Sequence, residues 1–253
     1  MSLTLQKAGL WKRVSAFLFD IILTITIAMG FAAITSAVFD YNGHIVEMQA
    51  RYAVYEEEYG VDFDITEEEY EKLTEEEKAT MQEAYKALNN DEELLKIQNL
   101  LFYMTLAILS ISAFLAILFW QFIIPLFFKN GQTLGKKIFG IAVMRTNSVK
   151  VTNPVLFIRA MIGMFAIETM FPLFMLIMIY FGALGIVGVI TILLLLGLQI
   201  GVMIYTKTNS AIHDLLCDTV VVDFASQMIF ETEEALMTYQ QEKAQQNVLN
   251  SSN

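Results

Sequence analysis

The chain has 253 residues, of which 56% are hydrophobic and 17% charged, and its mean hydropathy is +0.53. A water-soluble domain of this length needs more charge to cover its surface, and here the apolar residues form long blocks. The composition therefore excludes an ordinary soluble protein and indicates a membrane protein. One cysteine, Cys217, excludes an internal disulfide framework, and with only two histidines beside it a zinc site is not expected either. We expect no metal ion and no cofactor.

The net charge of −11 comes from one segment of the chain. Residues 40–97 contain 18 acidic and 5 basic side chains, a net charge of −13, so the remainder carries a net charge of +2. The basic residues of that remainder lie beside the apolar blocks. The sequence thus predicts a membrane protein that carries an acidic insert.

The apolar blocks predict four transmembrane helices. Residues 17–39 and 99–128 are each long enough to cross a hydrocarbon core of about 30 Å. Residues 155–205 are too long for one crossing, and we expect a tight hairpin near residues 180–185 to divide them. A cleavable signal peptide is the alternative for the first block, but that block is too long and no A-x-A-type site precedes Asp40. The predicted fold class is an all-α membrane protein with a four-helix transmembrane bundle.

Lys and Arg near the ends of the spans predict the orientation, because cytoplasmic loops carry an excess of these residues. Both termini are expected in the cytoplasm and the acidic insert outside, in a multi-pass protein of the cell membrane. Trp11 and Trp120 both fall at the cytoplasmic interface in this arrangement. The basic residues that fix the cytoplasmic side are Lys7, Lys12, Arg13, Lys129, Lys136, Lys137, Arg145, Lys150, Arg159 and Lys207. The predicted segments are the cytoplasmic N-terminus with the first span (1–39), the acidic insert (40–97), the second span (98–128), a basic cytoplasmic loop (129–154), the third and fourth spans (155–205) and a cytoplasmic C-terminal segment (206–253).

The acidic insert is predicted to be helical. Thr66 with Glu69 and Thr74 with Glu77 have the spacing of capping boxes, in which the two side chains satisfy backbone donors at the start of a helix. Tyrosines supply apolar surface for a small helical cap. They are Tyr41, Tyr52, Tyr55, Tyr59, Tyr70 and Tyr85.

A calcium loop is the alternative for part of the insert. Asp62 and Asp64 have the spacing that begins such a loop, but Glu67 stands where the loop needs glycine and Leu73 where it needs its last glutamate. A solvated pair of acidic helices fits the residues better.

The basic loop could form a short cytoplasmic β element. Residues 141–145 and 149–151, joined by a turn at 146–148, have the alternation of a β-hairpin, and residues 219–222 could add another strand beside it. The tail after Phe230 is predicted to be a polar helix with a frayed end.

Arg13 and Asp20 are the first pair of candidate site residues. They lie seven residues apart, close to two helical turns, so both project from one face about 10 Å apart along the axis. Their side chains could meet through a water or a third group in an ion-coupling site. The alternatives are a static ion pair, or an Arg13 that merely extends to the lipid headgroups.

Glu168 is the deepest acidic residue of the predicted spans and the second candidate site. Pro172 has no N–H, so it leaves the carbonyl of Glu168 free to serve with the carboxyl as a cation or proton site. A protonated Glu168 that bonds a neighbouring helix is the alternative. Arg159 lies nine residues away, on the opposite face of an α-helix, and is not expected to be its partner. Pro125 similarly frees the carbonyl of Gln121.

The fourth span and the segment after it contribute the remaining candidates. Gly197 and Gly201 form a small-residue face that lets another helix approach closely, within this chain or in a homo-oligomer. His213 and Asp214 lack the serine or cysteine neighbour of a nucleophilic triad. No hydrolase motif occurs in the sequence, so we do not expect an enzyme, and no nucleic-acid partner is expected.

Three ordered motifs resemble the RDD family of membrane proteins. They are Ala8-Gly9-Leu10-Trp11-Lys12-Arg13 with Asp20, Asn130-Gly131-Gln132-Thr133-Leu134-Gly135-Lys136-Lys137 with Gly140-Ile141-Ala142-Val143, and Ala211-Ile212-His213-Asp214-Leu215-Leu216 with Thr219-Val220-Val221-Val222. The family is named for one arginine and two aspartates, which the resemblance places at Arg13, Asp20 and Asp214. The matches bracket about residues 7–39 and 98–223, so nothing transfers to the acidic insert.

The resemblance implies transport, since sodium–proton exchange is linked to some members of the family and the binding or regulation of membrane partners to others. It also favours a bacterial plasma membrane. Our first hypothesis is a homo-oligomeric carrier in which Arg13, Asp20 and Asp214 form a charged cluster, with Glu168 as a way station. It predicts that Asp20→Asn abolishes transport without abolishing folding.

The second hypothesis is a non-catalytic membrane adaptor that binds a protein partner through residues 40–97 or the cytoplasmic tail. It predicts that deletion of residues 45–95 removes the phenotype while Asp20→Asn does not. The lipid bilayer is a partner in both hypotheses.

Overall fold

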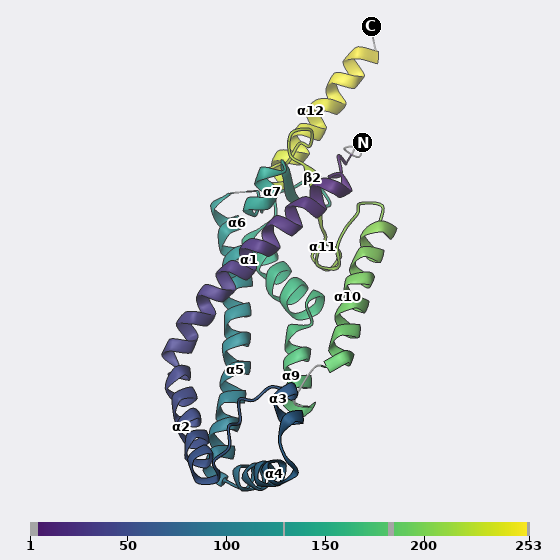
Figure 1. Ribbon diagram of the computed structural model, residues 1–253. Helices are drawn as coiled ribbons and strands as arrows, with labels where there is room; N and C mark the ends of the chain where they lie inside the picture. Colours follow the sequence, from purple (N-terminus) through teal and green to yellow (C-terminus); the bar gives the residue numbers. More distant parts are fainter. Residues whose placement is uncertain (1–4, 129, 182–184, 252–253) are drawn as a thin grey trace. The chain divides into compact units, whose positions relative to one another are not determined.

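The computed structural model describes residues 5–128, 130–181 and 185–251, most of which are helical (Figure 1). The α-helices are α1 (Leu10–Val38), α2 (Tyr41–Tyr59), α3 (Glu67–Lys72), α4 (Glu75–Asn89), α5 (Glu92–Leu118), α6 (Ile124–Phe127), α7 (Leu134–Ile138), α8 (Asn153–Ile158), α9 (Phe171–Phe181), α10 (Gly185–Tyr205), α11 (Ile212–Leu216) and α12 (Glu233–Ser251). The other elements are two strands, β1 (Ile141–Arg145) and β2 (Thr219–Asp223), and two π-helices, η1 (Phe119–Ile123) and η2 (Arg159–Glu168). The chain divides into two compact units, residues 30–112 and the remainder.

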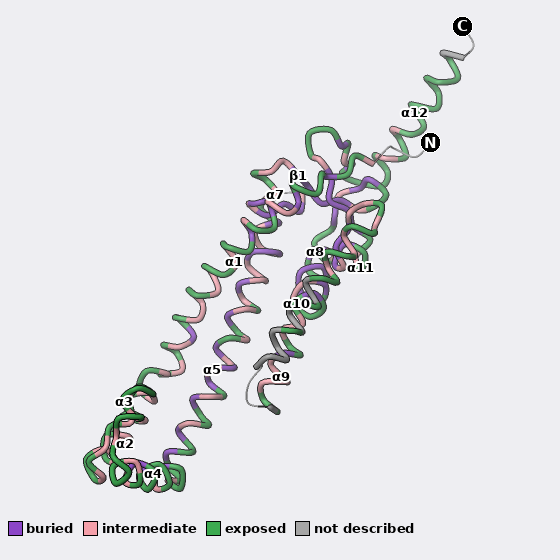
Figure 2. Tube along the Cα trace, turned by 45° about the vertical axis from the view of Figure 1, so that its right-hand side comes forward, coloured by how far each residue is buried: buried purple, intermediate pink, exposed green. Residues whose placement is uncertain are grey.

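Three helical stretches are long and apolar enough to cross a membrane: Leu10–Val38, Glu92–Phe127 and Asn153–Tyr180. They correspond to the first three predicted spans. Along α1 many apolar side chains are exposed (Figure 2), as expected for a helix whose solvent is lipid. The predicted hairpin includes residues 182–184, which lie outside the described residues, as do several side chains of α10. The fourth span, the bundle and its orientation therefore stay predictions.

The helix that contains the second candidate span begins at Glu92, inside the predicted acidic insert. Asp91 accepts hydrogen bonds from the backbone N–H groups of Glu93 and Leu94 at 2.9 and 3.1 Å, which caps the first turn of α5. Near its far end this helix changes to the π-helix η1 just before Pro125. Because proline has no N–H, the α-helical pattern of hydrogen bonds cannot pass through it unchanged.

The unit of residues 30–112 contains the helices of the acidic insert, and both predicted capping boxes are present. The Thr66 side chain accepts from the backbone N–H of Glu69 at 3.3 Å, and the Glu69 side chain accepts from the backbone N–H of Thr66 at 2.8 Å. The Thr74 box has the same geometry. Phe63 packs against the rings of Tyr52 and Tyr85, so tyrosines do supply part of the apolar contact.

Asp62 and Asp64, on which the alternative of a calcium loop depended, form a local turn. The Asp62 carboxylate accepts a hydrogen bond from the backbone N–H of Asp64 at 2.8 Å, an interaction typical of a turn. No cluster of potential metal ligands occurs among the described residues of the chain.

The β element is present, with a different main pairing from the predicted hairpin. β1 pairs antiparallel with β2, from Ile141 opposite Asp223 to Arg145 opposite Thr219. The segment after the turn contributes only an isolated bridge between Met144 and Lys150. Alternate residues of the strands pack into two apolar clusters, one on each face. β2 supplies three consecutive valines to these two clusters. Residues 149–151, which were predicted to pair with β1, are a shorter segment because α8 begins at Asn153. The longer apolar strand explains why β1 pairs with β2.

Candidate functional site

A buried carboxylate, Asp214 in α11, joins two arginines that lie far from each other in the sequence. Arg13 of α1 donates from Nη2 to Asp214 Oδ2 at 2.7 Å, and Arg159 of η2 donates from Nη2 to Oδ1 at 2.7 Å. The carboxylate is 0% exposed and Arg159 only 2%. Such a buried group is stable only when paired and hydrogen-bonded, so Asp214 ties α1, η2 and α11 together.

His213 extends this network to Glu168. Its Nε2 lies 2.6 Å from Arg159 Nη2, and its Nδ1 lies 2.6 Å from Glu168 Oε1. A guanidinium can only donate, so Nε2 accepts and Nδ1–H donates to the carboxylate, which is the arrangement of a neutral imidazole. Burial lowers the pKa of His213, as does the charge of Arg159, and both effects favour the neutral ring.

The π-helical geometry of η2 explains why Arg159 and Glu168 both reach His213, although an α-helix would place them on opposite faces; the structure shows no direct contact between these two described residues. In an α-helix nine residues separate opposite faces, but each turn of a π-helix contains almost one more residue. Nine residues then come close to two full turns, and both side chains reach His213. Gly163 lies between them, where an added Cβ would stand 2.6 Å from the Cβ of His213, so the close approach of α11 requires a glycine.

Asp20 makes a separate set of contacts. Its Oδ1 accepts from the indole N–H of Trp120 at 3.0 Å and from the backbone N–H of Gly135 at 2.9 Å, and Oδ2 accepts from the hydroxyl of Thr133. These donors come from η1 and from the start of α7. The predicted cluster of Arg13, Asp20 and Asp214 is therefore two separate sites in the structure. Arg13 pairs with Asp214, while Asp20 joins α1 to α7.

Gly135 is expected to be intolerant of a side chain, because an added Cβ would stand 2.5 Å from the backbone oxygen of Ala16 and 2.8 Å from Asp20 Oδ1. We predict that Gly135→Ala lowers the free energy of unfolding by about 2–3 kcal/mol through overpacking. Thermal unfolding of the detergent-purified protein measures this. Gly9→Ala is the control, since an added Cβ there meets no atom within 4 Å. Equal loss of stability in the two variants would contradict the prediction.

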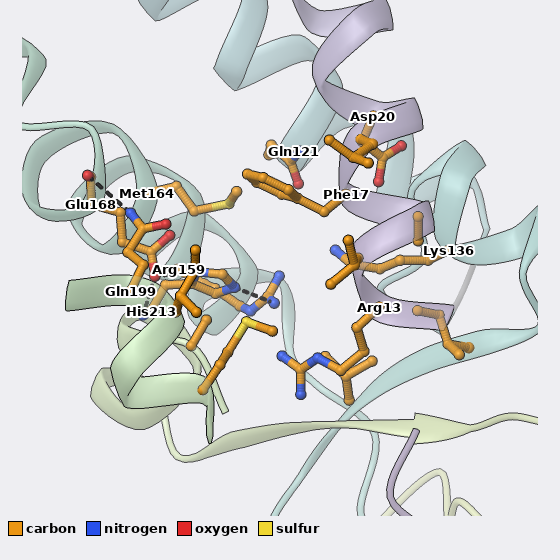
Figure 3. A pocket seen from close by; sticks show the side chains of 18 residues that line it. Arg13, Phe17, Asp20, Gln121, Lys136, Arg159, Met164, Glu168, Gln199 and His213 are labelled. Atoms are coloured by element: carbon orange, nitrogen blue, oxygen red, sulfur yellow. Dashed lines mark hydrogen bonds and ion pairs between the residues drawn. The ribbon is translucent and has the colours of Figure 1, made fainter. Parts of the chain in front are cut away.

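Two adjacent cavities lie beside these networks, with volumes of about 290 and 250 Å³. Asp20, Gln121, Glu168 and Gln199 line both of them. Figure 3 shows the first cavity, with Asp20 and Lys136 on one side and Glu168 on the other. The second is lined by Asp20 and Glu168 but by no Lys or Arg of the described residues.

Two oxygen atoms at the cavities lack hydrogen-bond donors among the described residues. Gln121 Oε1 is buried without a partner, and Glu168 uses Oε1 alone to accept from the His213 backbone and ring. The Glu168 carbonyl, which the sequence predicted to be free, instead accepts from Gln199 Nε2 at 3.0 Å. The helix breaks after Glu168, where Met170 has a φ of 46°, so Pro172 stands in the first turn of a new helix.

The model of the RDD family matches residues 7–218 of the chain. The chain belongs to the RDD family. RDD proteins are membrane proteins, in agreement with the three apolar helices. No curated protein and no solved structure matched this RDD chain.

Sequence reasoning on this RDD protein placed Arg13, Asp214, His213 and Glu168 among the site residues, and the structure connects these four through Arg159. Arg159 itself was used only as one of the basic residues that predict the cytoplasmic side of the membrane. Its position in an apolar block was a usable indication, because an ionisable residue inside a span needs a partner.

Proposed function

We propose that this RDD protein is a carrier that exchanges a small monovalent cation for protons, with Glu168 as the ion-coupling carboxylate. The observation that carries this proposal is the cavity of about 250 Å³, where Glu168 Oε2 and Gln121 Oε1 are without donors from the described residues. Glu168 is only 7% exposed and lies within a candidate span. Unsatisfied acceptors are costly in such a place unless a ligand or water meets them.

The available atoms favour a cation over an anion. Arg13 and Arg159 both donate to Asp214, and Asp214 together with Glu168 supplies two negative charges against the two positive charges of these arginines. The groups without partners are oxygens of a carboxylate and an amide, which are the ligands of hard cations. Because one water occupies about 30 Å³ of the liquid, the cavity has room for an ion with several waters.

Asp214 and its arginines have a supporting role in this proposal. They hold His213 in the orientation in which Nδ1–H donates to Glu168, and so they fix one oxygen of the carboxylate and leave the other toward the cavity. The coupling role that the sequence assigned to Asp20 passes to Glu168, because all of Asp20's contacts are to donors of the protein itself.

The proposal includes four spans, both termini in the cytoplasm of a bacterial cell, and a homo-oligomer. Gly197 and Gly201 support the oligomer, since an added Cβ at either position would meet no atom of the described residues within 4 Å. A second copy could therefore pack on this face. An enzymatic function is not part of the proposal.

The test is alkali-cation-driven proton flux in proteoliposomes. We expect Glu168→Gln to reduce flux to the level of protein-free vesicles, because the neutral amide still accepts from the His213 backbone but carries no negative charge to bind the cation. Glu231→Gln, on an exposed carboxylate paired with Lys150, is the control and should retain flux within about twofold. Thermal unfolding of both variants checks that they are folded.

Full flux in Glu168→Gln would refute the role of Glu168. Absence of flux in wild-type vesicles with every alkali cation would refute the carrier and favour the adaptor hypothesis. In that case deletion of residues 45–95 becomes the decisive variant, because it removes the predicted protein-binding insert.

A further inference from the structure

Lys136 is a charged side chain of the first cavity that the proposed function has not used. It lies in α7, and its side chain extends into the cavity (Figure 3). Its backbone N–H donates to the Thr133 hydroxyl at 3.3 Å, which anchors the main chain. Among the described residues its ammonium makes no hydrogen bond or ion pair, in contrast to Arg13 and Arg159 in the same cavity.

The ionisable groups around Lys136 come from three elements, and the one carboxylate among them with an oxygen lacking a donor, Glu168, lies on the opposite side of the cavity (Figure 3). They are Arg13 and Asp20 of α1, Arg159 and Glu168 of η2, and His213 and Asp214 of α11. Asp20 already accepts three hydrogen bonds, and Asp214 is paired with both arginines. An ammonium without a partner loses its hydration and gains little in return.

The proton on Lys136 is therefore held weakly. Burial lowers the pKa of Lys136 to about 7, with a further contribution from the charge of Arg159, while Asp20 and Asp214 act in the opposite direction. A lysine amine with such a pKa changes its charge within the physiological pH range.

The charges around the cavity balance only when Lys136 is protonated. Arg13, Arg159 and Lys136 then compensate three carboxylates, and His213 is neutral. The carboxylates are Asp20, Glu168 and Asp214. Loss of the proton from Lys136 leaves one net negative charge beside the unpartnered oxygens of Glu168 and Gln121. One monovalent cation at those oxygens restores the balance.

We propose that Lys136 is the proton-exchange group of the carrier: its amine holds a proton while the cation site is empty and releases that proton when one monovalent cation binds at Glu168. The step replaces an ammonium and an empty site by a neutral amine, a bound cation and one released proton, so charge is conserved and the exchange is one for one. This inference rests on the proposed function and assigns the proton to a residue outside the cation site.

The neighbouring lysine provides a matched control. Lys137 is exposed and lies over the ring of Phe128, with 4.2 Å between its Nζ and the ring centroid. Lys136→Met keeps the length of the side chain without the charge, and Lys136→Arg keeps the charge permanently. Neither substitution removes the backbone contact to Thr133.

The experiment measures binding of radioactive Na⁺ and Rb⁺ to protein in lipid nanodiscs between pH 5.5 and 8.5. In the wild type the apparent Kd should rise about tenfold for each pH unit below the pKa of Lys136, because one proton competes with one cation, and should level off above it. Lys136→Met should bind tightly and Lys136→Arg weakly, both without pH dependence. Lys137→Met should behave as the wild type.

Each contrary result has a distinct meaning. If Lys136→Met keeps the pH dependence of the wild type, another group carries the proton and the inference is refuted while the carrier stands. If the wild type binds neither cation, the proposed function fails and this inference fails with it. Thermal unfolding should show all three variants folded, because the ammonium of Lys136 has no partner among the described residues and Lys137→Met loses only an exposed contact with the ring of Phe128.

Discussion

Asp214→Asn is expected to lower the free energy of unfolding by about 3–5 kcal/mol, the usual result of removing one partner of a buried ion pair. The carboxylate is fully buried, and its loss leaves Arg13 and Arg159 as neighbouring charges without compensation. The measurement is thermal unfolding of detergent-purified protein. Asp218→Asn is the control, because Asp218 is exposed and its side chain accepts a single hydrogen bond, from Thr146.

The pH dependence gives a second test of the same carboxylate. Burial raises the pKa of Asp214, but the charges of Arg159, His213 and Arg13 outweigh it and hold the pKa well below its usual range. A carboxyl with a depressed pKa in the folded state stabilises the protein above its unfolded pKa of about 3.9 and loses that contribution as the pH falls through the folded value. The difference in stability between wild type and Asp214→Asn should therefore persist from pH 5 to pH 8, altered only by the effect of the Asp214 charge on the pKa of Lys136. A difference that vanishes within this range would contradict the assignment.

Two substitutions of Asp20 should distinguish its contribution to the stability of the fold from a contribution to transport. Asp20→Ala leaves the donors of Trp120, Thr133 and Gly135 without an acceptor, and at about 1–3 kcal/mol for each buried donor we expect a loss near 4 kcal/mol. Asp20→Asn keeps one acceptor oxygen for Trp120 and Gly135, and its amide can donate to the Thr133 hydroxyl. Its loss should be about 1–2 kcal/mol.

Transport by the folded Asp20→Asn protein is the informative quantity. The carrier hypothesis from the sequence predicts no flux, whereas the contacts of Asp20 predict flux within a few-fold of the wild type once the vesicles contain equal amounts of folded protein. Unfolding temperatures and flux measured on the same preparations decide between the two. A stable Asp20→Asn variant without flux would show that Asp20 takes part in ion transport.

Features that depend on local sequence were predictable. The apolar blocks located three membrane-length helices because hydrocarbon thickness alone sets their length. The capping boxes at Thr66 and Thr74 followed from a spacing of three residues, since both partners belong to one turn. The strand of three valines before Asp223 was predicted beside the hairpin from its run of β-branched residues, whereas the main pairing of residues 141–145 was assigned to residues 149–151.

Features that depend on tertiary contacts were not predictable. Nothing near Asp20 in the sequence indicates that its donors come from residues 100 or more positions away. The pairing of Arg159 with His213 required a helix type that the amino-acid pattern of residues 159–168 does not encode. An α-helical angle of about 100° per residue was the reasonable assumption there, and the resulting half-turn error placed Glu168 on the wrong face.

The π-helical form of η2 also determines which changes in chain length this segment tolerates. Shortening it by one residue between Arg159 and Glu168 would permit ordinary α-helical hydrogen bonds and would remove no charged or polar side chain. The two ends of the segment would nevertheless no longer face His213 together. Such a one-residue deletion would leave the apolar composition of this candidate span almost unchanged, yet the segment would have lost the alignment on which the buried network depends.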